Sequence, residues 1–174
     1  MNFRPKDEIV TISDAERKVL DVLDGLGIAY VRHEHPPVFT VEDADKYWTA
    51  LRGTHCKNLF LRNKKGNRHY LVVAPTHRAV DLRRLNDAVH EDRLSFGSPE
   101  RLLRCLGLEP GSVSPFGLVN DASKEVRVIV DEELRTSAFL GFHPNTNTAT
   151  LDISAADFEK FLASRGNEVR YLKL

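Results

Sequence analysis

The stretch KNLFLRNKKGNRHYLVVAP, residues 57–75, decides the fold class of this chain. Two runs rich in apolar, aromatic and β-branched residues, 57–63 and 69–75, flank a polar segment that contains Gly66 and Asn67. Two such runs joined by a short turn with glycine and asparagine predict a β-hairpin. A second pair of runs, residues 138–144 and 148–154 around Asn145-Thr146-Asn147, predicts another hairpin.

Helices and further strands are interspersed with the two hairpins. Residues 13–26 predict a helix, because Ser13 and Glu16 form an S-x-x-E capping box and the apolar residues that follow fall on one helical face. Further helices are predicted over residues 40–51, 79–89, 98–106 and 154–164, and further strands over residues 28–34, 126–131 and 168–174. Residues 109–121 are expected to form a loop that closes into a short apolar strand. The pattern predicts one mixed α/β domain of the α+β class over residues 1–174, with a mainly antiparallel mixed sheet and flanking helices.

Composition excludes several classes of protein. The 174 residues are enough for one domain with a real core, and 41% hydrophobic and 29% charged residues are typical of an ordinary globular protein. Lysine plus arginine and aspartate plus glutamate each total 25, which argues against a protein that coats duplex nucleic acid or a membrane. Two cysteines without a C-x-x-C pair favour a reducing compartment, and the absence of an apolar leader or a span of about 20 apolar residues favours the cytoplasm.

Histidine and cysteine suggest two kinds of chemistry. His33 and His35 would share one face of a strand, and His55 adjoins Cys56, but a zinc site needs three or four convergent ligands and no third ligand has a recognisable spacing. Cys56 as a nucleophile is disfavoured, because neighbours on a strand point to opposite faces and His55 would not serve as its base. We therefore expect no metal, and we regard strand-end histidines and a buried structural cysteine as the simpler interpretations.

Two loops are candidates for a binding site. GSVSPFG, residues 111–117, combines two glycines with a proline, and a rigid turn of this kind can present backbone N–H groups to a carbonyl or carboxylate oxygen. GFHPNTN, residues 141–147, fixes His143 at the mouth of the second hairpin. A plain connection for the first loop and a turn residue for His143 remain open alternatives.

Five segments in this order resemble the YbaK/prolyl-tRNA synthetase-associated domain family. They are GTHCKNLFL with Lys57, HYLVVA, GSVSPFGL with its Gly-x-x-x-Pro motif, VRVIVD and GFHPNTNTATL, and the resemblance extends over roughly residues 15–172. Within that family they are most similar to the free-standing prolyl-tRNA editing proteins that deacylate alanyl-tRNA(Pro). The resemblance implies a metal-independent domain without a cofactor that hydrolyses the ester between a mischarged amino acid and the terminal adenosine.

The resemblance also implies roles for individual residues. Lys57 matches a lysine that contacts the backbone of the terminal nucleotide, the 111–115 loop matches a motif whose amides hold the aminoacyl carbonyl, and His143 matches a histidine beside the amino-acid pocket. The implied catalytic residues are Lys57, Gly111, Ser112 and His143. The implied substrate-binding residues are Val113, Ser114, Pro115, Gly141, Phe142 and Pro144. Contacts to the acceptor stem are expected from Lys64, Lys65, Arg83 and Arg84.

The implied partner is the acceptor end of tRNA(Pro) carrying alanine, and prolyl-tRNA synthetase is a candidate protein partner, with neither DNA nor a membrane expected. Three alternatives remain open. The chain could deacylate another mischarged tRNA carrying Cys, Ser or Thr, it could bind aminoacyl-tRNA or a synthetase without hydrolysis, or it could bind a small molecule. The roles of His55 and Cys56 stay open as well.

Overall fold

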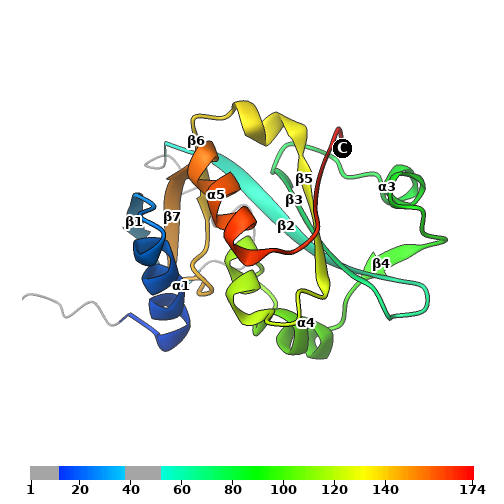
Figure 1. Cartoon of the computed structure of the whole chain (residues 1–174), viewed down its shortest axis with the longest axis horizontal. Coiled ribbons are helices and arrows are strands. Elements are labelled where there is room, and N and C mark those ends of the chain that lie inside the picture. Colours follow the sequence, from blue (N-terminus) through cyan, green and yellow to red (C-terminus); the bar gives the residue numbers. More distant parts are fainter. Residues whose placement is uncertain (1–11, 38–51) are drawn as a thin grey trace, which may run out of the picture.

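The computed structural model describes residues 12–37 and 52–174, and the helix expected over residues 40–51 lies outside them. One sheet organises the described residues (Figure 1), with the strand order β1-β7-β6-β2-β3-β5-β8 and with β4 paired to β2. The strands are β1 (Tyr30–Glu34), β2 (Thr54–Asn63), β3 (His69–Pro75), β4 (Leu94–Phe96), β5 (Val126–Asp131), β6 (Phe139–Phe142), β7 (Ala149–Ser154) and β8 (Val169–Leu172).

The α-helices are α1 (Asp14–Gly25), α3 (Leu82–Val89), α4 (Pro99–Leu106) and α5 (Ala155–Arg165). The described residues also form two 3-10 helices, η1 (Pro115–Asn120) and η2 (Glu132–Thr136). Within the described ranges, no helix combines the length and apolarity needed to cross a bilayer.

Both expected hairpins are confirmed. β2 and β3 pair antiparallel with Phe60 opposite Leu71, and β6 pairs antiparallel with β7. The first turn closes on Asn63, whose Oδ1 accepts the N–H groups of Asn67 and Arg68, while Gly66 takes a φ of +70° that glycine adopts without strain. β1–β7 and β2–β4 are antiparallel too, whereas β2–β6, β3–β5 and β5–β8 are parallel, so the mixed sheet has the expected class.

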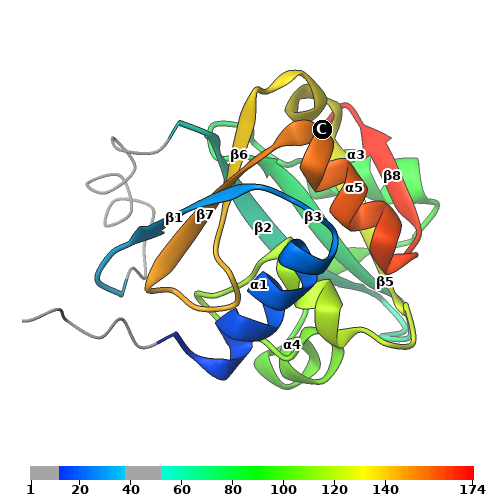
Figure 2. The same ribbon diagram turned by 60° about the vertical axis from the view of Figure 1, so that its left-hand side comes forward.

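The sheet has an inner face and an outer face. Helices α1, α4 and α5 gather on the inner face (Figure 2), where the larger core contains Leu23, Leu106, Phe158 and strand residues such as Val128 and Leu151. Helix α3 packs on the outer face, where Leu85 and Val89 meet a smaller core that includes Leu61, Tyr70 and Ile129. Since strand side chains alternate between faces, this division assigns a face to each strand residue.

Three details differ from the sequence prediction. Residues 115–120 form η1 instead of a strand, because the Ser114 hydroxyl accepts the Phe116 N–H and Pro115 occupies the first helical position. The helix expected over residues 79–89 begins only at Leu82, since Asp81 caps it. The sequence prediction also missed the short strand β4, which pairs with β2 far away in sequence.

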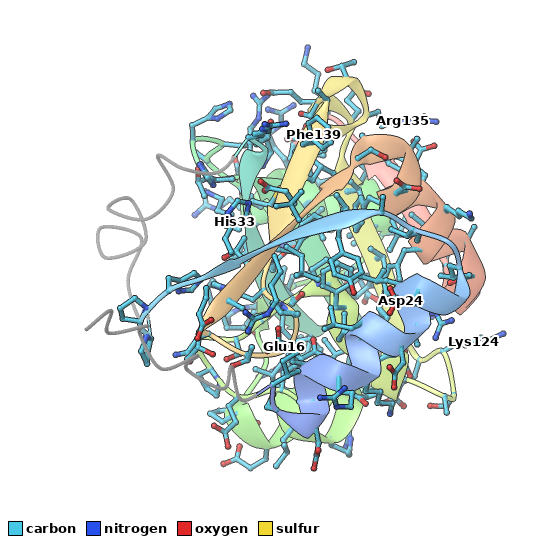
Figure 3. All side chains as sticks on the ribbon, turned by 90° about the vertical axis from the view of Figure 1, so that its left-hand side faces the viewer. Glu16, Asp24, His33, Lys124, Arg135 and Phe139 are labelled. Carbon is cyan, nitrogen blue, oxygen red and sulfur yellow. The ribbon has the colours of Figure 1, made fainter. Side chains whose placement is uncertain are left out.

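The capping box at α1 is only half formed. Ser13 Oγ accepts the N–H of Glu16, as expected. The Glu16 carboxylate instead binds Arg32 on β1, with Oε1 2.6 Å from Nε (Figure 3 labels Glu16 on α1). A tertiary ion pair has therefore replaced the second half of a local motif, and it joins α1 to the edge of the sheet.

Candidate active site

The sheet opens along one edge of β2. Thr54 and His55 pair with β6, and Leu61 to Asn63 pair with β4 on the same edge. Between these two pairings, residues 56–59 form no strand pairing on that edge with any described segment. The opening between β2 and β6 is the place where side chains from different parts of the chain meet.

A small hollow occupies this opening. Among described residues its lining consists of His55, Cys56, Asn58, Gly141, Phe142, His143 and Thr150. Its volume is about 20 Å³, which is enough for one water molecule or for a substituent of similar size such as a methyl group. The hollow therefore brings together the start of β2, the predicted His143 loop and β7.

The outer face beside the hollow is polar. Leu140 and Phe142 on β6, Leu151 and Ile153 on β7 and Phe60 on β2 all belong to the inner core. Strand alternation then places their neighbours on the outer face. These outer-face residues are His33, His55, Lys57, Gly141, Thr150 and Asp152. The outer face thus has an apolar half under α3 and a polar half around the hollow.

Lys57 lies where the two halves of the outer face meet. It is half-buried and stands between Cys56 and Asn58, which both line the hollow, although Lys57 is not itself among the lining residues. No described residue forms a hydrogen bond or ion pair with its ammonium group. Its positive charge is therefore available to a ligand on the outer face.

His143 is held in one tautomer. Its Nδ1 lies 2.8 Å from the carbonyl oxygen of Ala149, so Nδ1 carries the hydrogen and donates it. Burial lowers the pKa of His143, and His35 nearby lowers it further, although the bond to Ala149 acts in the opposite direction. The ring is therefore neutral near pH 7, and the lone pair on Nε2 can accept a proton or a hydrogen bond.

His35 and Thr150 support this arrangement. His35 Nδ1 donates to the Pro36 carbonyl at 2.9 Å, so its Nε2 accepts from the Thr150 hydroxyl, also at 2.9 Å. The Thr150 oxygen then faces His143 Nδ1 at 3.5 Å, and the two imidazole rings are 5.7 Å apart. His33 does not join this chain, because its Nε2 contacts the Asp152 carboxylate at 3.1 Å (Figure 3 labels His33 on β1).

Asp152 fixes the start of β2. Its Oδ2 accepts the Arg52 N–H at 3.1 Å, and its Oδ1 lies 3.0 Å from where a Cβ on Gly53 would be. The same hypothetical Cβ would lie 2.9 Å from the backbone of Leu140. A side chain at position 53 would therefore force β2 and β6 apart beside the hollow.

Asn58 connects β2 to the predicted 111–115 loop. Its Nδ2 donates to the Val113 carbonyl at 3.1 Å, and its Oδ1 is buried without a hydrogen-bond partner among described residues. An unpaired buried amide oxygen is costly and points to a ligand or a water at that position. Asn58 was not among the predicted site residues, although it directly follows Lys57 and is polar within an apolar run.

The backbone of the loop is partly committed to internal bonds. The Ser112 N–H donates to the Glu109 carbonyl, and the Phe116 N–H donates to Ser114 Oγ. Pro115 has no N–H. In the described part of the chain, no acceptor meets the amides of Gly111, Val113 and Ser114, so these three amides are the free donors of the loop. Gly111 has a φ of +91°, a backbone conformation that favours glycine.

The second predicted loop mixes site and core residues. Gly141 and Phe142 line the hollow, but the Phe142 ring is buried against Phe116 and Phe158 at 5.9 and 4.8 Å. Pro144 is buried after the strand end. Asn145, which was not a predicted site residue, takes a φ of +60°. Its Nδ2 lies 3.4 Å from the Phe116 carbonyl, so it connects this turn to η1.

Cysteine chemistry is disfavoured at the hollow. Burial raises the pKa of the Cys56 thiol strongly, so the thiolate needed for nucleophilic attack is scarce. Cys56 Sγ instead contacts the Thr54 carbonyl at 3.4 Å. His55 also lines the hollow, but it lies on the opposite face of β2 from Cys56, as strand alternation predicts.

One group of side chains, away from the hollow, has the spacing of metal ligands. Within the described ranges, ligand atoms of His69, Cys105 and Glu125 lie within 4.8 Å of one another. Arg101 Nη1 is 3.1 Å from His69 Nε2 and Arg104 Nη2 is 3.6 Å from Cys105 Sγ, and two such cations oppose a metal ion. His69 lies six residues along β3 from Pro75, the partner of Cys56, so this group is roughly 20 Å from the hollow at the usual strand rise.

The predicted tRNA-contacting cations lie apart from the hollow. Lys64 and Lys65 belong to the turn of the first hairpin, at its far end. Arg83 and Arg84 lie in the first turn of α3 on the outer face. Only Arg84 among these four lines the cavity between α3 and β8, which is described below.

Comparison with known proteins gives a consistent result. The family model described as "Aminoacyl-tRNA editing domain" matches residues 35–161. The chain is 42% identical over 161 residues to "Prolyl-tRNA editing protein ProX" of Acetoanaerobium sticklandii, covering 92% of this chain and 98% of that protein. It is also 34% identical to "Prolyl-tRNA synthetase associated domain-containing protein 1" of Danio rerio, covering 86% of this chain and 82% of that protein.

Solved structures share the fold. A crystal structure of a candidate trans-editing enzyme for prolyl tRNA synthetase has a TM-score of 0.70 at 24% identity, covering 94% of this chain and 99% of that chain. The crystal structure of the hypothetical protein APE2540 has a TM-score of 0.71 at 17% identity, covering 88% of this chain and 97% of that chain. At these identities the similarity establishes the architecture alone.

Proposed function

Because this chain belongs to the aminoacyl-tRNA editing domain family, we propose that it is a deacylase that releases alanine from mischarged Ala-tRNA(Pro). The observation that carries the proposal is the small hollow, because its volume of about 20 Å³ suits a methyl side chain and it lies beside Lys57, His143 and the 111–115 loop. The relative with 42% identity, named a prolyl-tRNA editing protein, supports tRNA(Pro) as the carrier. We further propose that the protein acts in the cytoplasm and that prolyl-tRNA synthetase is its protein partner.

The chemistry needs positioning more than a strong nucleophile. An aminoacyl ester is already activated, and holding it in register with a water molecule can supply much of the acceleration. The free amides of Gly111, Val113 and Ser114 are the donors that we assign to the developing oxyanion. Such donors are worth about 10²–10³ in rate each.

The side chains then take three roles. His143 Nε2, which has the free lone pair, accepts a hydrogen bond from the attacking water. Lys57 binds the phosphate of the terminal nucleotide as a flexible point charge, which suits its unpaired ammonium group. Asn58 holds the 111–115 loop against β2 and offers its unpaired Oδ1 to the substrate.

Selectivity is steric in this proposal. A hollow with room for a methyl group excludes the larger ring of proline, so correctly charged tRNA is spared. Exclusion by size is the effective direction, because favourable binding of one extra methylene discriminates only about 10–200-fold. Serine and cysteine side chains exceed alanine by one atom and are the closest rivals.

The test is a deacylation panel of the purified protein against Ala-, Pro-, Cys- and Ser-tRNA, with rates compared at equal concentrations. We expect Ala-tRNA(Pro) to be hydrolysed fastest and Pro-tRNA to be spared. Equal hydrolysis of Pro-tRNA would contradict the steric hollow, and binding without hydrolysis would identify a recognition module instead of an enzyme.

Lys57→Ala is the companion variant. We expect it to fold normally and to lose at least tenfold in kcat/KM, because a phosphate contact is worth about 1.5–3 kcal/mol and no described residue uses this ammonium group in the fold. Lys160→Ala on α5 is the matched control, since Lys160 is exposed on a helix of the opposite face. Wild-type activity in Lys57→Ala would remove Lys57 from the site.

A further inference from the structure

A second cavity, larger than the hollow, lies on the outer face between α3 and β8, which Figure 2 shows beside each other. Its volume is about 330 Å³, within the usual range of small-ligand pockets. Its apolar lining, which we call the apolar floor, consists of Ala79, Leu85, Ala88, Leu172 and Leu174. Its charged lining residues are Arg78, Asp81, Arg84 and Lys173.

Two of these charges are available to a ligand. Arg78 is neutralised, because its Nε lies 3.1 Å from the buried Asp131 carboxylate and its Nη2 donates to Glu133. The Asp81 carboxylate is engaged as the N-cap of α3. Arg84 and Lys173 are exposed, and neither side chain forms an ion pair or hydrogen bond with a described residue. The cavity therefore presents two cations without a described ion-pair partner, Arg84 and Lys173, together with the capping carboxylate of Asp81.

The cavity shares a face and a row of the sheet with Lys57. Lys57 pairs with Ala74, and Asp131 pairs with Leu172. Because Val73 pairs with Val130, the next residues in register are Ala74 and Asp131. Lys57 is thus three strand spacings from Leu172, about 14 Å along one row of the outer face. The two residues between them, Ala74 and Asp131, are fully buried, so an RNA strand that reaches both Lys57 and the cavity passes over the side chains that cover this row, such as Arg78.

We propose that this cavity is a second anchoring subsite for RNA, which holds a nucleotide of the single-stranded acceptor end upstream of the terminal adenosine. Arg84 and Lys173 bind its phosphate, and the apolar floor contacts its base or sugar. None of the described lining residues is aromatic, so the subsite contributes phosphate binding that is independent of base sequence. The inference rests on the proposed function, and it adds a place where the substrate is held away from the chemistry.

The experiment compares two substrates that share the reacting ester. One is Ala-tRNA(Pro), and the other is 3′-O-alanyl-adenosine, which lacks every upstream nucleotide. We expect Arg84→Glu and Lys173→Glu each to reduce the preference in kcat/KM for the tRNA over the small ester about tenfold, through KM. Each lost phosphate contact should also lower the slope of log affinity against log salt by about 0.7.

Three further variants test whether the effect is specific to the cavity. Ala88→Trp fills the cavity without changing charge and should reduce the same preference, with melting curves to confirm that it folds. Lys160→Glu makes the same charge change as Lys173→Glu on the opposite face and should leave the preference unchanged. Arg83→Glu makes the same charge change at the residue next to Arg84. Because Arg83 is exposed and does not line the cavity, this variant should reduce the preference less than Arg84→Glu does.

Several outcomes would overturn the subsite. An unchanged preference in Arg84→Glu, Lys173→Glu and Ala88→Trp would do so, and so would an equal loss in Arg83→Glu and Arg84→Glu, which indicates diffuse attraction. Competition at the cavity by free AMP with no change in tRNA preference would assign the cavity to a mononucleotide. Failure of the proposed function looks different, because wild-type protein would then hydrolyse neither substrate.

Discussion

His143 illustrates how a single hydrogen bond defines the chemistry of a residue. The Ala149 carbonyl can only accept, so Nδ1 must donate and Nε2 must keep its lone pair. Burial then lowers the pKa of the ring, so the neutral form persists. A free imidazole on the surface would have neither a fixed tautomer nor a fixed direction.

The first prediction at this scale concerns pH. Because the pKa of His143 is lowered, kcat should stay level from about pH 8 to about pH 6.5 and fall only at lower pH, as the ring is protonated. As the pH falls, the histidine of the unfolded chain is protonated at a higher pH than the buried ring of the folded protein. The free energy of unfolding should therefore decrease as the pH falls over the same range. A pH–rate profile measures the first effect.

His143→Ala should remove this limb of the profile and lower kcat about 10²-fold. His77→Gln serves as the control, because His77 is exposed and lies outside the hollow. An unchanged rate in His143→Ala would return this residue to a turn position.

The second prediction concerns Gly111, whose φ of +91° penalises any side chain. Gly111→Ala should reduce the free energy of unfolding by about 1–2 kcal/mol and reduce kcat as well, because it moves the free amides of the loop. Gly27→Ala is the matched control, since Gly27 has a φ of +65° and open space around it, far from the loop in sequence. Equal losses of stability with a normal rate in both variants would argue against oxyanion donors in this loop.

At the scale of elements, the ion pair between Glu16 on α1 and Arg32 on β1 fixes the position of β1, the edge strand of the sheet that carries His33. Glu16 is buried, while Arg32 is partly exposed and also contacts Glu34 at 3.4 Å. β1 carries His33 on its outer face and Arg32 on its inner face, and His35 follows directly after its last residue. The position of β1 therefore couples helix packing to the polar half of the outer face.

Glu16→Ala should lower the free energy of unfolding by about 3 kcal/mol, at the lower end of the range for a broken buried pair because Arg32 retains some solvent. Glu34→Ala, which removes an exposed carboxylate from the same arginine, should cost less than about 1 kcal/mol. Chemical denaturation of both variants measures the difference. Similar small losses would show that Arg32 is adequately solvated without Glu16.

At the scale of the whole molecule, the sheet separates the proposed substrate site from the larger core. Its inner face is covered by α1, α4 and α5, whereas the hollow, Lys57 and the cavity beside α3 all belong to the outer face or to its opening. The group formed by His69, Cys105 and Glu125 lies at the other end of the first hairpin. Burial raises the pKa of Cys105 to about 11, which keeps that thiol protonated.

This arrangement predicts that a chelator leaves deacylation unchanged, since the proposed steps use amides, an imidazole and an ammonium group. Deacylation of Ala-tRNA(Pro) before and after treatment with EDTA measures it, with added Zn²⁺ as the converse test. Inhibition by EDTA that Zn²⁺ reverses would direct attention to the histidines of the outer face and to His69.

The hairpins, the capped helices and the mixed class of the sheet can be predicted from local sequence, because turns, caps and periodicity act over a few residues. Local sequence also indicated the 111–117 loop and His143 as site candidates, whereas the role of Lys57 came from the resemblance to the editing family. Three other features follow from the folded chain alone: β2 separates from β6 after His55, Asn58 binds Val113, and Glu16 binds Arg32 instead of closing its capping box. These features depend on pairings between strands and loops far apart in the chain, and such pairings are set by the packing of the whole sheet, which no local pattern encodes.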